Sequence, residues 1–149
     1  MNPDRELVRE FLRSGTQSPI SITTNPLACA LNLTLIEARA QPGRAVLHCD
    51  PLPLFVQGAG VLQGGALSAM VDFAMAFAAM SALTDEEAAV TTTLEVAFLR
   101  PARAGPYEVI GELVRRGKTI IFACAELRPM GNPDLVVTAA STLSIIRAR

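Results

Sequence analysis

One carboxylate stands in the least polar stretch of this 149-residue chain. Asp72 is the only charged residue between Asp50 and Asp85, and in a helix it would have apolar side chains on every side. A buried carboxylate is costly unless it is paired or hydrogen-bonded. Two explanations remain open from the pattern alone: a structural pairing, or a carboxylate kept for acid–base or nucleophilic chemistry.

A glycine pair precedes Asp72 at a spacing that could complete a site. If a helix starts near Gly64, Asp72 lies about two turns inside it. The free N–H groups of a first helical turn can bind an oxyanion, and glycine leaves them open to approach. The step Gln63-Gly64-Gly65 could equally serve a turn or close helix packing. The coincidence of one charge, one polar residue and two glycines on this segment favours a functional site.

The segments around this run predict the elements that must position it. A long helix is expected over about residues 64–83, because Ala, Leu, Met and Phe favour helix and because its hydrophobicity on all sides requires other structure around it. A short amphipathic helix is expected earlier, opened by Pro3 and Asp4 and closed by Gly15. Alternating or β-branched runs predict strands over 28–40, 44–50, 88–102, 105–117, 118–131 and 135–148.

The order of these segments predicts an α+β fold. The last four strands, joined by short turns, indicate an antiparallel meander, although hairpin joints alone leave the strand order open. The economical arrangement is a curved antiparallel six-stranded sheet wrapped around one long central helix. Residues 1–24 would form an N-terminal helical extension of a single domain over 1–149.

Composition narrows the classes of function. A net charge of −1 argues against a nucleic-acid partner. The three cysteines are far apart, which argues against a disulfide framework or a zinc site, and one histidine argues against a transition-metal centre or a Cys-His site. The charged N-terminus lacks the apolar stretch of a signal peptide, and the apolar run 60–83 contains a carboxylate. These last two features predict a cytoplasmic protein without a membrane span. The three cysteines are Cys29, Cys49 and Cys124, and the one histidine is His48.

The run from Gly60 to Asp72 resembles the active-site helix of hotdog-fold thioesterases, in particular the phenylacetate-degradation and 4-hydroxybenzoyl-CoA types. Their typical signature is G-x-x-H-G-G, followed by Asp or Glu nine residues beyond the histidine. Here "GVLQGG" supplies the glycines, and Asp72 stands nine residues after Gln63. The segments "FLRPARAG" and "RRGKT" resemble two further family segments, so the resemblance covers about residues 25–147.

The resemblance implies an acyl-CoA thioesterase that hydrolyses a thioester to a free acid and coenzyme A without a cofactor. Asp72 would act as a general base or a nucleophile, and the Gly64 N–H would bind the thioester oxygen, with Gly65 beside the substrate. Gln57 matches a position near the substrate carbonyl, and Thr91 matches a Ser/Thr position that can hold the water. In the family, the carboxylate and the oxyanion donor of one site come from different subunits. An obligate homodimer, often paired into a tetramer, is therefore expected.

Gln63 departs from the family pattern, which has histidine at this position. An imidazole can carry a proton, whereas an amide can only orient a group. We expect Asp72 and Gly64 to be the essential pair, so that activity survives with an altered rate or pH dependence. The first alternative is a hotdog protein that binds acyl-CoA without cleaving it; a hotdog hydratase and a purely structural dimer are the others.

Six of the thirteen basic residues fall between positions 100 and 128. Each alone fits a solvated strand end. Together they could meet the phosphates of coenzyme A, because guanidinium groups match phosphate oxygens. Arg115, Arg116 and Lys118 are the first candidates for this role.

Overall fold

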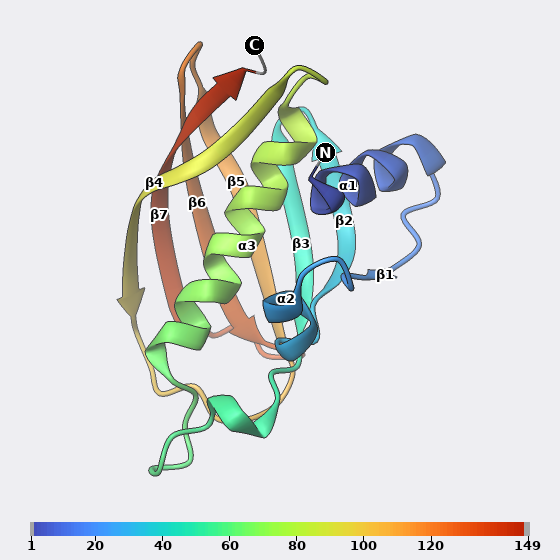
Figure 1. Ribbon diagram of the computed structural model, residues 1–149. Coiled ribbons are helices and arrows are strands. Elements are labelled where there is room, and N and C mark those ends of the chain that lie inside the picture. Colours follow the sequence, from blue (N-terminus) through green and yellow to red (C-terminus); the bar gives the residue numbers. More distant parts are fainter. Residues whose placement is uncertain (1, 148–149) are drawn as a thin grey trace.

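A computed structural model describes residues 2–147 of the chain. Its longest helix, α3 (Gly64–Ala82), lies across the concave face of an antiparallel seven-stranded sheet (Figure 1). The strands are β1 (Ile20–Ser21), β2 (Thr34–Ala40), β3 (Gly43–Cys49), β4 (Glu87–Phe98), β5 (Tyr107–Arg116), β6 (Ile120–Pro129) and β7 (Val137–Arg147). The other helices are α1 (Pro3–Ser14), the short α2 (Pro26–Ala30) and a 3-10 turn at Pro53–Phe55. The expected curved sheet around one central helix is confirmed.

The central helix is buried because the sheet and α1 cover most of its sides. The side chains of Met70, Met75 and Phe77 are fully buried. Gly111 on β5 permits the close approach of helix and sheet, since a Cβ at this position would stand 2.2 Å from the carbonyl oxygen of Ala74. By length and composition alone α3 could cross a membrane, but 56% of its most apolar window is buried in this fold.

The strand order, β1-β2-β3-β5-β6-β7-β4, corrects one expectation. Strands β5, β6 and β7 form a meander as predicted. The prediction is wrong for β4, which pairs with β7 along its whole length and forms one edge of the sheet. The connection over residues 99–106 contains two prolines and is too long for a tight hairpin, so β4 is not held beside β5.

Two local features near the N-terminus also differ from the expected pattern. The predicted strand over 28–40 begins only at Thr34, because Asn25 caps a short helix by accepting hydrogen bonds from two backbone N–H groups. Pro26 then occupies the first helical position, where its missing N–H costs nothing. The two-residue β1, which was not predicted, pairs with β2. The predicted first helix is confirmed and ends at Gly15, whose φ is 65°. Residue 148 of the last predicted strand lies outside the described residues.

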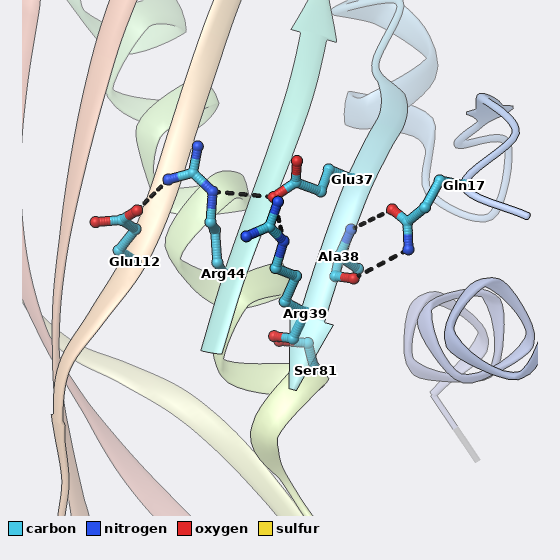
Figure 2. A network of polar contacts seen from close by, with 7 residues as sticks. All are labelled: Gln17, Glu37, Ala38, Arg39, Arg44, Ser81 and Glu112. Atoms are coloured by element: carbon cyan, nitrogen blue, oxygen red, sulfur yellow. Dashed lines mark hydrogen bonds and ion pairs between the residues drawn. The ribbon is translucent and has the colours of Figure 1, made fainter. Parts of the chain in front are cut away.

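A network of charged side chains lies on β2, β3 and β5, on the side of the sheet that faces away from α3 (Figure 2). Arg44 donates to Glu37 over 3.0 Å and also pairs with Glu112 on β5, while Arg39 lies 3.0 Å from the same Glu37 oxygen. Partly exposed pairs of this kind add little stability individually. Arg44 stands directly opposite Glu112 in the β3–β5 register, and opposite charges at facing positions favour that register over its alternatives.

Candidate active site

Asp72 lies in the middle of α3 and is partly buried. The hydroxyl of Thr91, on the edge strand β4, donates a hydrogen bond to Asp72 Oδ1 over 2.9 Å. The ion pairs found among residues 2–147 do not include Asp72. The structural pairing with an arginine, left open by the sequence, is therefore absent from the described chain. The carboxylate is instead oriented by a neutral hydroxyl.

At the N-terminal end of α3, two backbone N–H groups make no hydrogen bond within residues 2–147. Gln63 is the N-cap residue, and its exposed side chain makes no capping hydrogen bond. Its carbonyl accepts the N–H groups of Ala66 and Leu67, at 3.0 and 3.2 Å. Among residues 2–147, the N–H groups of Gly64 and Gly65 make no hydrogen bond. These two N–H groups stand at the positive end of the helix dipole, where they can stabilise an oxyanion.

A groove of about 400 Å³ adjoins this helix end. The loop before α3, the first turns of α3 and the segment after β4 form its walls. The loop is fixed to that segment, because the Leu62 N–H donates to the Ala102 carbonyl over 2.7 Å and Val61 pairs with Arg103. The groove is mainly apolar, with side chains of Val61, Leu62, Leu67, Phe98 and Leu99 in its walls.

The sequence-predicted residues fall into two groups along α3. Gln57 and Gln63 lie exposed in the loop at the Gly64 end, whereas Thr91 contacts Asp72. The side-chain oxygen of Gln57 accepts the Ala59 N–H over 3.4 Å, so its amide is held within its own loop. Gly64 and Asp72 are eight positions apart on the helix, which corresponds to a rise of about 12 Å. Within one chain these two groups cannot contact the same thioester carbonyl.

The three basic candidates gather at the other end of the molecule (Figure 1). They lie at and beside the turn between β5 and β6, which is near the C-terminal end of α3. Arg115 and Lys118 are exposed. The guanidinium of Arg116 pairs with Glu87, the first residue of β4. Its role as a phosphate ligand stays a prediction, but this side chain already has an acidic partner.

Glu87 is a buried residue that the sequence analysis missed. It follows two other acids, so that the run resembles a solvated turn. In the structure only 5% of Glu87 is exposed. The Thr84 backbone N–H, which donates to its carboxylate over 3.1 Å, and the nearby Arg116 lower the pKa of Glu87, against the opposing effect of burial. Arg147 adds a second ion pair at 3.4 Å.

His48 and Cys49 lie on opposite faces of β3, as their alternation predicts. The imidazole of His48 is on the convex face, 3.6 Å from Glu108, with the sheet between it and α3. Burial raises the pKa of the Cys49 thiol. Among residues 2–147, no three His, Cys, Asp or Glu side chains gather into a potential metal site.

Comparison with known proteins gives the family. The sequence profile of the Thioesterase superfamily matches residues 59–133, a segment that contains Gly64, Asp72 and Thr91. A Saccharolobus solfataricus protein named "Putative esterase" is 32% identical over 88 residues, which are 59% of this chain and 62% of that protein. The chain thus matches less than two thirds of the length of this relative.

Two solved structures resemble the chain over most of its length. One is a "putative thioesterase, phenylacetic acid degradation-related protein" from Ralstonia eutropha, 28% identical, which covers 92% of this chain and 98% of its own with a TM-score of 0.78. The other is a thioesterase family protein from Silicibacter pomeroyi, 26% identical, with coverage of 97% and 99% and a TM-score of 0.79. The curved sheet around α3 is the expected hotdog fold, and the chain belongs to the thioesterase superfamily.

Proposed function

We propose that this protein is an acyl-CoA thioesterase, which hydrolyses an acyl-CoA to a free acid and coenzyme A. Asp72 carries the proposal. It is the only charged residue of α3, it has no ion-pair partner in the described chain, and Thr91 orients it. A carboxylate held in this way can accept a proton from water or attack a carbonyl. Membership of the thioesterase superfamily supports thioester hydrolysis in general; the acyl-CoA substrate is our proposal.

A site shared by two subunits would allow Asp72 of one chain and Gly64 of the other to contact the same thioester. Strand β4 is a twelve-residue edge, with Val90, Leu94 and Phe98 at least 38% exposed. An unpaired edge of this length and hydrophobicity favours pairing with another strand. If two β4 strands pair antiparallel about a two-fold axis midway between Thr91 and Phe98, Thr91 comes opposite Phe98 of the partner subunit. Asp72 would then approach the helix N-terminus of the partner, and this homodimer is the catalytic unit that we propose.

These groups are sufficient for hydrolysis of the thioester. In the base-assisted route, Asp72 takes a proton from a water molecule while the oxygen of that water bonds to the thioester carbonyl carbon. The N–H groups of Gly64 and Gly65 stabilise the oxyanion that forms. The tetrahedral intermediate collapses, the carbon–sulfur bond breaks, and the proton on Asp72 passes to the departing thiolate of coenzyme A. In the nucleophilic route, the Asp72 carboxylate attacks the carbonyl carbon, the carbon–sulfur bond breaks, and the thiolate of coenzyme A leaves an acyl–aspartyl anhydride. Water then hydrolyses the anhydride to the acid and the free Asp72 carboxylate, and the proton it releases passes to the thiolate.

The test is thiol release from aromatic and aliphatic acyl-CoA esters by the wild type and by Asp72→Asn. Asp85→Asn is the matched control, because it makes the same change at a side chain that is 89% exposed. Turnover by the wild type and the control, together with its loss in an Asp72→Asn variant with an unchanged circular dichroism spectrum, supports the proposal. Full activity of Asp72→Asn would overturn it.

An acyl-CoA-binding protein without turnover is the second candidate. The observation in its favour is Gln63, because the amide at this helix end cannot donate a proton as a histidine can. Calorimetric binding of acyl-CoA without thiol release on any ester would establish this candidate. If Gln63→His then gained several orders of magnitude in turnover, the missing imidazole would be the cause.

The phosphates of coenzyme A provide a separate test of the basic candidates. Arg116→Ala would also break the ion pair with Glu87, so the informative variant is the double change Arg115→Ala and Lys118→Ala. It should raise KM for acyl-CoA while leaving kcat and folding unchanged. An unchanged KM would exclude these two exposed side chains as phosphate ligands.

A further inference from the structure

Phe98, the last residue of β4, closes one side of the groove beside the helix N-terminus. Its backbone pairs with Val137 at the end of the β4–β7 ladder. The tip of its ring points at Gly64, since a Cβ at position 64 would stand only 3.2 Å from Phe98 Cζ. The residue nevertheless remains 52% exposed. Within a single chain, the ring therefore contacts the helix at one end and has its remaining surface uncovered.

The groove is small and has little freedom to widen on the side of the loop. Its volume of about 400 Å³ lies near the lower end of the range for small-molecule sites, about 300–1,000 Å³. The backbone contacts of Val61 and Leu62 with the segment after β4 hold two of its walls together. The charged residue in its lining, Arg100, is paired with Asp134 at 2.5 Å. An apolar group is therefore the occupant that this lining favours.

We propose that Phe98 limits the size of the acyl group that this protein accepts. The inference rests on the proposed thioesterase function and adds a substrate class to it: short or single-ring acyl groups, with long alkyl chains excluded. A thioester oxygen bound at the Gly64 N–H has its acyl group beside the groove. The Phe98 ring, which cannot move closer to α3, then blocks the extension of a longer chain. Removing the ring opens the groove along the first turn of α3.

The experiment compares kcat/KM for hexanoyl-, benzoyl- and dodecanoyl-CoA in the wild type, Phe98→Ala and Phe98→Leu. The wild type should prefer the first two esters. In Phe98→Ala the ratio for dodecanoyl-CoA over hexanoyl-CoA should rise by about tenfold or more, a size that pocket changes of a few methylene groups produce. Phe98→Leu should give a smaller rise in the same ratio, because it retains part of the wall.

Val90→Ala is the matched control. Val90 is also an exposed apolar residue of β4, 51% exposed, but it lies outside the groove. Size-exclusion chromatography of every variant separates an effect on the groove from an effect on the pairing of β4 edges. The same ratio in wild type, Phe98→Ala and Phe98→Leu, with all three active, would overturn the role of Phe98. No hydrolysis of any ester by the wild type would overturn the proposed function, and this inference with it.

Discussion

The two ends of α3 differ in what their polar groups do. Every helix has unpaired N–H groups at its start and unpaired carbonyl groups at its end. At the start of α3, the N–H groups of Gly64 and Gly65 make no hydrogen bond within residues 2–147 and adjoin an apolar groove. At the other end, the Ser81 hydroxyl, 2.7 Å from the Ala78 and Arg39 carbonyl oxygens, ties the last turn to β2.

Hydrogen bonds and ion pairs connect the residues just beyond the C-terminal end of α3 to other elements. Arg5 of α1 donates to the Thr84 carbonyl, and Glu87 joins Arg116 and Arg147. The two ends of the helix therefore have different roles. Polar groups that are paired within the chain stabilise the fold, whereas the unpaired N–H groups remain available to a ligand. Substitutions at the two ends should therefore affect different measurements.

The largest expected effect is the loss of turnover in Asp72→Asn. Removing a catalytic base or nucleophile should lower kcat by about 10³-fold. The free energy of unfolding should stay within about 1 kcal/mol of the wild type, because the amide can still accept the Thr91 hydrogen bond. Kinetics of thiol release and urea denaturation measure the two quantities. A large loss of stability with little loss of kcat would assign Asp72 to the fold.

Glu87→Gln should show the opposite pattern. It removes the charge from a buried carboxylate that binds Arg116 and the Thr84 N–H, so the free energy of unfolding should fall by about 1–2 kcal/mol. Turnover at a temperature well below the unfolding midpoint should remain near that of the wild type. Glu86→Gln, at the exposed neighbouring acid, is the control in the same denaturation experiment. Equal stability of the two variants would contradict the importance of the Glu87 cluster.

Acid should weaken the same cluster. The pKa of Glu87 is lowered in the folded protein from its ordinary value of 4.5. The unfolded chain therefore binds a proton more readily, and the contribution of Glu87 is complete above pH about 4.5 and is lost as the pH falls through its folded pKa. The wild type should lose more stability than Glu87→Gln over this acid range. Denaturation curves with parallel pH dependence in the two proteins would argue against the shift.

Thr91→Val should reduce kcat by about tenfold, the equivalent of one hydrogen bond to a charged group. Thr91→Ser should recover most of the activity, because the serine hydroxyl can still donate to Asp72. A purely structural role would instead lower the unfolding midpoint in proportion to the loss of activity. Steady-state kinetics and thermal denaturation of both variants distinguish these cases.

The smallest effect is expected at the pair Arg9–Asp85, which joins the partly buried Arg9 of α1 to the exposed Asp85 in the turn after α3. Its nitrogen–oxygen distance is 2.6 Å, but Asp85 is 89% exposed. Asp85→Ala should change the free energy of unfolding by no more than about 0.5 kcal/mol. A loss as large as that of Glu87→Gln would mean that exposed contacts secure this end of the helix as strongly as buried ones.

Local sequence signals were sufficient to predict several helices and strands. Apolar residues on all sides of 64–82 predicted both the helix and its burial, because such a surface requires cover in every direction. The alternating runs predicted β5, β6 and β7, and Gly15 predicted the end of α1. Asp72 and the glycine pair stood out because their chemistry conflicts with the apolar segment around them.

Other features depend on contacts between distant parts of the chain. The pairing of β4 with β7 could not be derived, because a connection of this length leaves more than one strand order open. The buried cluster of Glu87 joins residues 29 and 60 positions apart in sequence. Asn25 followed by Pro26 was a local helix signal that the alternation of the next residues concealed.

The sequence by itself determined the buried central helix, its single carboxylate and the open glycine step, since these follow from residue type and spacing. Only the tertiary structure decided that Thr91 orients Asp72, that Arg116 is engaged by Glu87, and that the Phe98 ring closes the groove at Gly64. The physical reason is that hydropathy and backbone preference act locally. The partner of a given side chain depends instead on strand order and on the path of the connections.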